Sequence, residues 1–89
     1  MTIVNNVISV GTAIREIASP DDNPQIILIH NHDHTSSDDL FIGGPNVTAA
    51  NGFHVPKTET LQIHLAAGDG LFAVSDDQPI IVHVLQTKI

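Results

Sequence analysis

The sequence predicts an all-β fold, a small single-domain β-sandwich or barrel of seven to eight short strands. Val, Ile and Thr fill the apolar segments, and such β-branched residues favour strands over helices. Turn-forming residues recur at short intervals and leave runs of about four to eight residues between them, which is the length of a strand. The 89 residues suffice for one modest core, so we expect residues 1–89 to form one domain.

Eight segments are predicted as strands: 4–10, 12–18, 25–32, 40–42, 52–55, 59–66, 71–74 and 80–85. The first two form either one bent strand or a pair. Segment 12–18 is also the one helical candidate, since Ile14 and Ile17 are three residues apart, but Pro20 would end a helix and a strand is favoured. Segment 59–66 alternates, with Leu61, Ile63 and Leu65 on one face and Gln62 and His64 on the other.

The expected turns account for most of the Gly, Asn and Asp residues. Asn51-Gly52 and Asp69-Gly70 are predicted to form tight turns, because Gly and Asn adopt positive φ at little cost. Paired carboxylates also fall in expected turns, where Asp is favoured for backbone reasons and is not expected to act as an acid or base. These pairs are Asp21-Asp22, Asp38-Asp39 and Asp76-Asp77.

Segments 25–32 and 80–85 are apolar on both faces, whereas a small sandwich buries one face of each strand. The surplus apolar face predicts a symmetric oligomer or a docking module. Residues 1–10 could form an extended N-terminal docking arm that adds a strand to the sheet edge of a partner. The apolar residues of this arm are Ile3, Val4, Val7, Ile8 and Val10.

Composition excludes several classes of function. The formal net charge is −7 with three basic residues, which argues against binding to a phosphate backbone, and the absence of Tyr and Trp leaves little surface for stacking bases or sugars. Without Cys there is no disulfide and no thiolate metal site. The apolar runs are far shorter than the roughly 18–20 residues of a membrane span, and the first residues do not resemble a signal peptide.

His30, His32 and His34 form an alternating row that could hold a transition metal. Neighbouring members of such a row share one face of a strand, about 6.6–6.8 Å apart, and His64 or His83 from another strand could supply a third ligand. One His per chain could also meet its copies on a threefold axis. The alternative is that these histidines are solvated surface residues.

Catalysis is not expected, and apart from this metal no cofactor is predicted. The serines lack the Gly-x-Ser-x-Gly arrangement of an activated nucleophile. His32-x-His34 followed by Asp38 is similar to the start of the cupin metal motif, but Asp replaces Glu and the later Pro-x-Gly is missing. A cupin-like metal-binding enzyme is therefore kept as an alternative.

Three motifs form one block of the sequence: Phe41-Ile42-Gly43-Gly44, Val47-Thr48-Ala49-Ala50-Asn51-Gly52 and Leu71-Phe72-Ala73-Val74-Ser75. This block resembles a group of small bacteriophage virion structural proteins, over roughly residues 25–87. The sequence departs from that group where His30, His32 and His34 stand in place of Asn, Gln or Gly.

The resemblance implies a non-enzymatic virion protein. The leading expectation is a capsid decoration protein that stabilises the head, binds the major capsid protein and forms a homotrimer, located on the surface of the virion. A tail or fibre component is the alternative within the same class. Neither nucleic acid nor a membrane is an expected partner.

Overall fold

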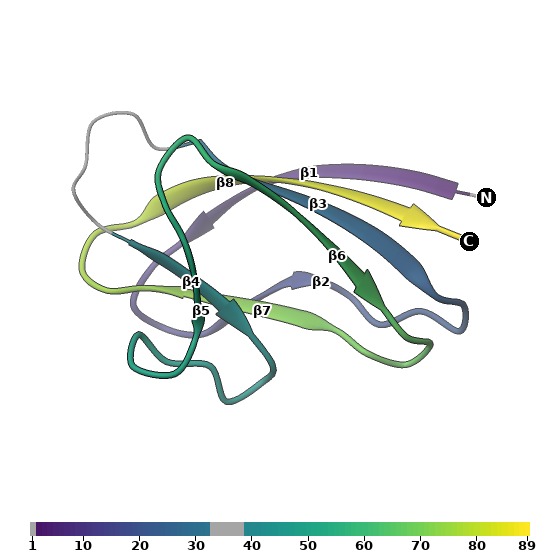
Figure 1. The fold of residues 1–89 in the computed structure, drawn as a ribbon, viewed down its shortest axis with the longest axis horizontal. Coiled ribbons are helices and arrows are strands. Elements are labelled where there is room, and N and C mark those ends of the chain that lie inside the picture. Colours follow the sequence, from purple (N-terminus) through teal and green to yellow (C-terminus); the bar gives the residue numbers. More distant parts are fainter. Residues whose placement is uncertain (1, 33–38) are drawn as a thin grey trace.

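The computed structural model describes residues 2–32 and 39–89. Within these residues the chain forms eight strands and no helix, so none of them lies in a helix that could span a membrane (Figure 1). The strands are β1 (Thr2–Val10), β2 (Arg15–Ala18), β3 (Gln25–Asn31), β4 (Leu40–Gly43), β5 (Phe53–Val55), β6 (Thr60–Leu65), β7 (Leu71–Ser75) and β8 (Ile80–Lys88).

The strands form two four-stranded antiparallel sheets, with the orders β1-β8-β3-β6 and β2-β7-β4-β5. Strands from opposite ends of the chain pair with each other, β1 with β8, β2 with β7, β3 with β6 and β4 with β5. The chain is thus one long hairpin rolled into two layers, which is the jelly-roll form of a β-sandwich (Figure 1). The predicted all-β fold class is confirmed.

The expected strands are found with small shifts at their ends. Segments 4–10 and 12–18 are two separate strands in different sheets, because residues 11–14 carry the chain from one layer to the other. The helical alternative for 12–18 is wrong, since its second half pairs with β7. Strand β8 runs three residues beyond the predicted end, where Gln86 is buried and Lys88 pairs with both β1 and β3.

The core lies between the sheets and is almost wholly aliphatic. Its members include Ile27 and Ile29 of β3 and Leu40 of β4, and each of these three side chains is fully buried. Leu61 and Ile63 pack against this core and Leu65 belongs to it, as the alternation in this segment predicted.

Two buried amide side chains close the core at the ends of β3. At one end, Gln25 Nε2 donates a hydrogen bond of 2.9 Å to the Ser19 carbonyl, and Gln86 Nε2 donates one of 2.9 Å to Gln25 Oε1. At the other end, Asn31 Nδ2 donates a hydrogen bond of 2.9 Å to the Val55 carbonyl. Ser19 follows β2 and Val55 belongs to β5, so both groups of hydrogen bonds join the two sheets. Buried amides are tolerated because these partners satisfy them.

The segment between β4 and β5 folds back over the outer face of the β2-β7-β4-β5 sheet. It buries Val47 there, leaving 4% of that residue exposed, and Val74 on the outer face of β7 is 5% exposed. A turn holds the segment in place: the Thr48 N–H donates to Asn51 Oδ1 at 2.7 Å, and the Gly52 N–H donates to the Thr48 carbonyl at 2.8 Å. This sheet is therefore partly covered on the side that faces away from the core.

Gly52 and Gly70 were predicted to serve their turns through positive φ, and this prediction is wrong. Among the described residues, positive φ occurs at Thr58 and Gly68 and not at Gly52 or Gly70. Gly52 is required by close packing instead, because an added Cβ would lie 2.6 Å from the Phe41 Cβ. The positive φ of Thr58 falls in the turn that leads into β6, where its N–H donates to the Asn31 carbonyl at 2.9 Å.

Candidate interaction surfaces

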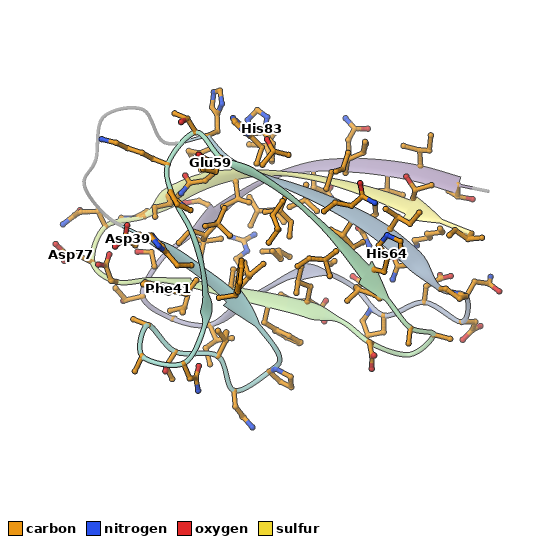
Figure 2. All side chains as sticks on the ribbon, in the orientation of Figure 1. Asp39, Phe41, Glu59, His64, Asp77 and His83 are labelled. Carbon is orange, nitrogen blue, oxygen red and sulfur yellow. The ribbon has the colours of Figure 1, made fainter. Side chains whose placement is uncertain are left out.

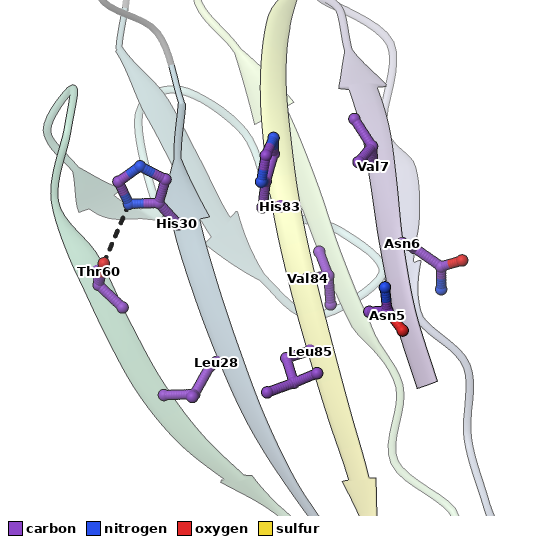
Figure 3. A pocket seen from close by; sticks show the side chains of 9 residues that line it. All are labelled: Asn5, Asn6, Val7, Leu28, His30, Thr60, His83, Val84 and Leu85. Atoms are coloured by element: carbon purple, nitrogen blue, oxygen red, sulfur yellow. Dashed lines mark hydrogen bonds between the residues drawn. The ribbon is translucent and has the colours of Figure 1, made fainter. Parts of the chain in front are cut away.

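The outer face of the β1-β8-β3-β6 sheet is formed by every second side chain of its four strands. Strand register arranges these side chains in rows across the sheet (Figure 3). From β1 to β6 the rows are Val7, His83, His30 and Thr60; Asn5, Leu85, Leu28 and Gln62; and Ile3, Thr87, Ile26 and His64. We call this surface the outer face.

Large apolar side chains are exposed on the outer face. Ile3 is 61% exposed, Val7 67%, Leu28 36% and Ile81 41%. Leu28 and Leu85 lie opposite each other on adjacent strands, beside a shallow depression of about 280 Å³. The surplus apolar surface predicted for segments 25–32 and 80–85 is thus present, and β1 enlarges it.

The outer face is also uncharged, although charged residues make up 15% of the chain. The four strands contain a single charged side chain, Lys88, which lies 3.6 Å from the Asp21 carboxylate. Glu59 lies directly before β6, where its carbonyl accepts a hydrogen bond of 3.0 Å from the Asn31 N–H. The other described acidic residues lie in the other sheet or in connecting segments, such as Asp39 and Asp77 near one end of the sandwich (Figure 2). Repulsion between like charges is therefore weakest at this face.

Three histidines cluster at one end of the outer face. The ring centroids of His32 and His83 are 4.3 Å apart with stacked planes, and that of His30 is 5.5 Å from His32 and 6.1 Å from His83. His30 Nδ1 lies 3.0 Å from Thr60 Oγ1, within hydrogen-bond distance. His83 joins this cluster because it lies opposite His30 in the register of β3 and β8.

The structure tests only part of the predicted metal site at His30, His32 and His34. His34 lies outside the described residues, and His64, the other suggested third ligand, is two rows from His30 beside Ile26. Among residues 2–32 and 39–89, no three His, Asp or Glu side chains are arranged to hold a metal ion. Metal binding that includes His34 stays a prediction.

The remaining histidine, His54, lies on the other sheet. Its Nε2 is 2.8 Å from Asp39 Oδ1, and its ring stacks on Phe41 with centroids 5.4 Å apart. These contacts tie β5 to the start of β4 at an exposed position. His54 therefore has a structural contact within its own sheet.

A second surface is the free edge of β1. In the described part of the chain, β1 has a neighbour, β8, on one side only, and pairs with it over nine residues. The expected docking residues are divided between two sides of this strand: Ile3 and Val7 are on the outer face, whereas Ile8 packs against the core and Val10 is fully buried. Residues 2–10 are therefore part of the sandwich. Arg15 Nη1 donates a hydrogen bond of 3.0 Å to the Ser9 carbonyl, and the edge before Ser9 has no neighbouring strand among the described residues.

Two comparisons, with protein-family models and with curated proteins, give no match to this chain. Among solved structures, the chain is similar to a protein of the Bacillus endospore appendages, which form a family of disulfide-linked pili. The TM-score is 0.54 at 10% sequence identity, and the match covers 99% of this chain and 89% of that chain. At this identity the likeness supports the fold; the present sequence contains no Cys for such a disulfide.

Proposed function

We propose that this chain is a non-enzymatic structural protein of a bacteriophage particle, and specifically a capsid decoration protein that binds the major capsid protein. The function is mechanical: a rigid β-domain adds binding free energy across neighbouring subunits, and many copies sum their contributions. The location that follows from this function is the surface of the virion.

The free edge of β1 is the observation that carries the proposal. Natural sheets protect a long edge strand with charges, proline or a covering segment, because open N–H and C=O groups invite pairing. Thr2–Val10 contains no charged residue and no proline over nine residues. Such an edge is suited to receive a strand of a partner, with backbone hydrogen bonds supplying the affinity.

Two further observations support an assembly role. The motifs around Gly43-Gly44 and Gly52, which resemble phage virion proteins, build the turn that covers the second sheet, so they maintain a rigid fold. The fold is also shared with a subunit of an assembled surface appendage.

The cupin-like alternative has less support, because His30 and His32 face away from the interior of the sandwich. A β-barrel enzyme binds its ligand between or at the mouth of its strands. His30 and His32 alternate with Ile29 and Asn31, which are fully buried, and therefore face away from the space between the sheets. That space holds the aliphatic core.

Co-sedimentation with capsids of the bacteriophage that encodes the chain tests the proposal. We expect the purified protein to pellet with empty capsids and the Asn6→Lys variant to lose most of this binding. Asn6 is exposed on β1, on the side of the strand that faces away from the outer face, and a lysine pointing inward on an edge strand hinders further pairing.

Ala49→Lys is the matched control, since it adds the same charge at an exposed position over the other sheet and should bind like the unmodified chain. Thermal unfolding of each variant verifies that the fold is retained. Binding to isolated tails and not to capsids would assign the chain to the tail, and binding to neither would refute the proposal.

A further inference from the structure

We propose that the outer face packs against the same face of a second copy of this chain, giving a sheet-on-sheet dimer. This pairing of two copies differs from the homotrimer that the resemblance to phage proteins implies. It does not depend on the capsid role, because the free edge of β1 lies at the side of the sheet and not on the packed face. The inference rests on the apolar character, charge and area of the outer face, taken in turn below.

The centre of the outer face is apolar, and further apolar side chains lie toward both of its ends. Leu28 and Leu85 occupy the middle row on adjacent strands, with Val7 and Ile81 toward one end and Ile3 toward the other. Side chains of this kind fill the space between packed sheets, which lie about 10 Å apart. Several large apolar side chains exposed on one face mark an interaction site.

Charge favours a copy of this chain as the occupant. The chain carries a net charge of −7, so most approaches of two copies bring carboxylates together. The outer face is the surface on which two copies meet without that repulsion, since its strands hold one charged side chain, Lys88, at the end of β8 and beside Asp21. A charged partner surface would lose hydration against this face and gain no counter-charge.

The area is sufficient for a small specific interface. Four strands about 4.8 Å apart, with nine, nine, seven and six residues, give a face of roughly 490 Å². Two such faces in contact bury on the order of 1,000 Å² in total, which is about the minimum expected of a specific interface between proteins.

The dimer also explains why the two sheets differ. Val47 and its turn cover the outer side of the β2-β7-β4-β5 sheet within one chain. No described segment covers the β1-β8-β3-β6 sheet in the same way, and its exposed Val7 and Leu28 are the counterparts that a second copy would bury. Stacked sheets in sandwiches pack with their strands about 30° apart, and the same geometry is open to two copies.

Light scattering coupled to size exclusion, with the unmodified chain at about 100 µM and neutral pH, tests this dimer at a concentration above the micromolar dissociation constants of small interfaces. We expect twice the chain mass of 9.5 kDa. Leu28→Lys and Val7→Lys each place a charge on the outer face and should raise the dissociation constant at least tenfold. Val7 is 67% exposed, so its variant tests the interface even if Leu28→Lys disturbs the fold.

Ile14→Lys is the matched control, because Ile14 is 45% exposed between β1 and β2 and lies off the outer face. It should dimerise like the unmodified chain. A monomer at this concentration, an assembly of three chains, or equal weakening by Ile14→Lys would each overturn the proposal.

A second measurement locates the contact. The chain lacks Cys, so a spin label on Gln62→Cys is unique in the molecule. When labelled chains are mixed with ¹⁵N-labelled unmodified chains, we expect broadening of amide signals from β1, β8, β3 and β6. A label on Ala49→Cys should leave those signals unchanged, and broadening confined to β2, β7, β4 and β5 by the Gln62→Cys label would refute the outer-face contact.

Discussion

Replacing Gly52 with alanine is expected to destabilise the fold by about 2–3 kcal/mol, although Gly→Ala is ordinarily stabilising where φ is negative. A Cβ at this position would lie 2.6 Å from the Phe41 Cβ, 2.8 Å from Val47 Cγ2 and 2.9 Å from the Thr48 carbonyl oxygen. Two of these three neighbours are close to or part of the backbone and cannot rotate away. The turn that carries Val47 must therefore move off the sheet, which exposes a buried side chain.

Urea unfolding followed by far-ultraviolet circular dichroism measures this loss, since the chain has no Trp or Tyr for fluorescence. Gly44→Ala is the control: it lies in the same segment, its φ is not positive, and an added Cβ would meet nothing within 4 Å. We expect Gly44→Ala to be neutral or more stable by up to about 1 kcal/mol. Equal stability of the two variants would contradict the packing role of Gly52.

These two glycines show how far the sequence could predict the structure. The dipeptide Asn51-Gly52 correctly indicated a turn, because such pairs are common in turns whatever their φ. The reason for the glycine was not accessible, since the approach of Phe41 and Val47 depends on how the whole segment folds over the sheet. Local propensity thus located the turn, and only packing explains its composition.

Strand positions were predictable for a similar reason, whereas strand partners were not. Alternation and turn spacing are local, so segments such as 25–32 and 80–85 could be assigned from the sequence. The pairing of β3 with β8 is a long-range property, and it decides that His83, and not His64, joins His30 and His32. The sequence could therefore identify the histidines as candidate ligands, but it could not predict which of them lie close together.

The buried amides were missed because Gln and Asn are most often surface residues. Gln25 and Asn31 are the first and last residues of β3 that point into the core. The apolar residues Ile27 and Ile29 between them do not indicate that these two amides are buried as well. Their role appears only when both sheets are in place, since the acceptors belong to Ser19 and Val55 on the other layer.

Asn31→Asp is expected to cost about 3–4 kcal/mol of stability at pH 7. The change keeps the shape of the side chain but replaces the Nδ2 donor with an oxygen facing the Val55 carbonyl, 2.9 Å away in the present structure. Two acceptors then oppose each other, and Asn31 is fully buried, so a carboxylate there would lose its hydration as well.

The stability of the Asn31→Asp variant should decrease as the pH rises. Burial and the facing carbonyl raise the pKa of the introduced carboxyl above the roughly 3.9 of an unfolded chain. The folded state then holds a proton that the unfolded state releases, so stability relative to the unmodified chain is greatest below about pH 4 and falls as pH rises through the folded-state pKa. At low pH the protonated oxygen can donate to the Val55 carbonyl and restore the contact between the sheets.

Chemical unfolding of the variant and the unmodified chain at pH 7 and pH 4 measures the difference. Asn31→Ala separates the two causes, since it loses the hydrogen bond to Val55 without adding a charge and should be less stable by about 1–3 kcal/mol at both pH values. Asn46→Asp adds the same charge at an exposed position and should change stability by less than about 0.5 kcal/mol. If the loss of stability in Asn31→Asp does not become smaller at pH 4, it arises from altered packing and not from a buried charge. The hydrogen bond between β3 and β5 would then contribute less to joining the sheets than the geometry indicates.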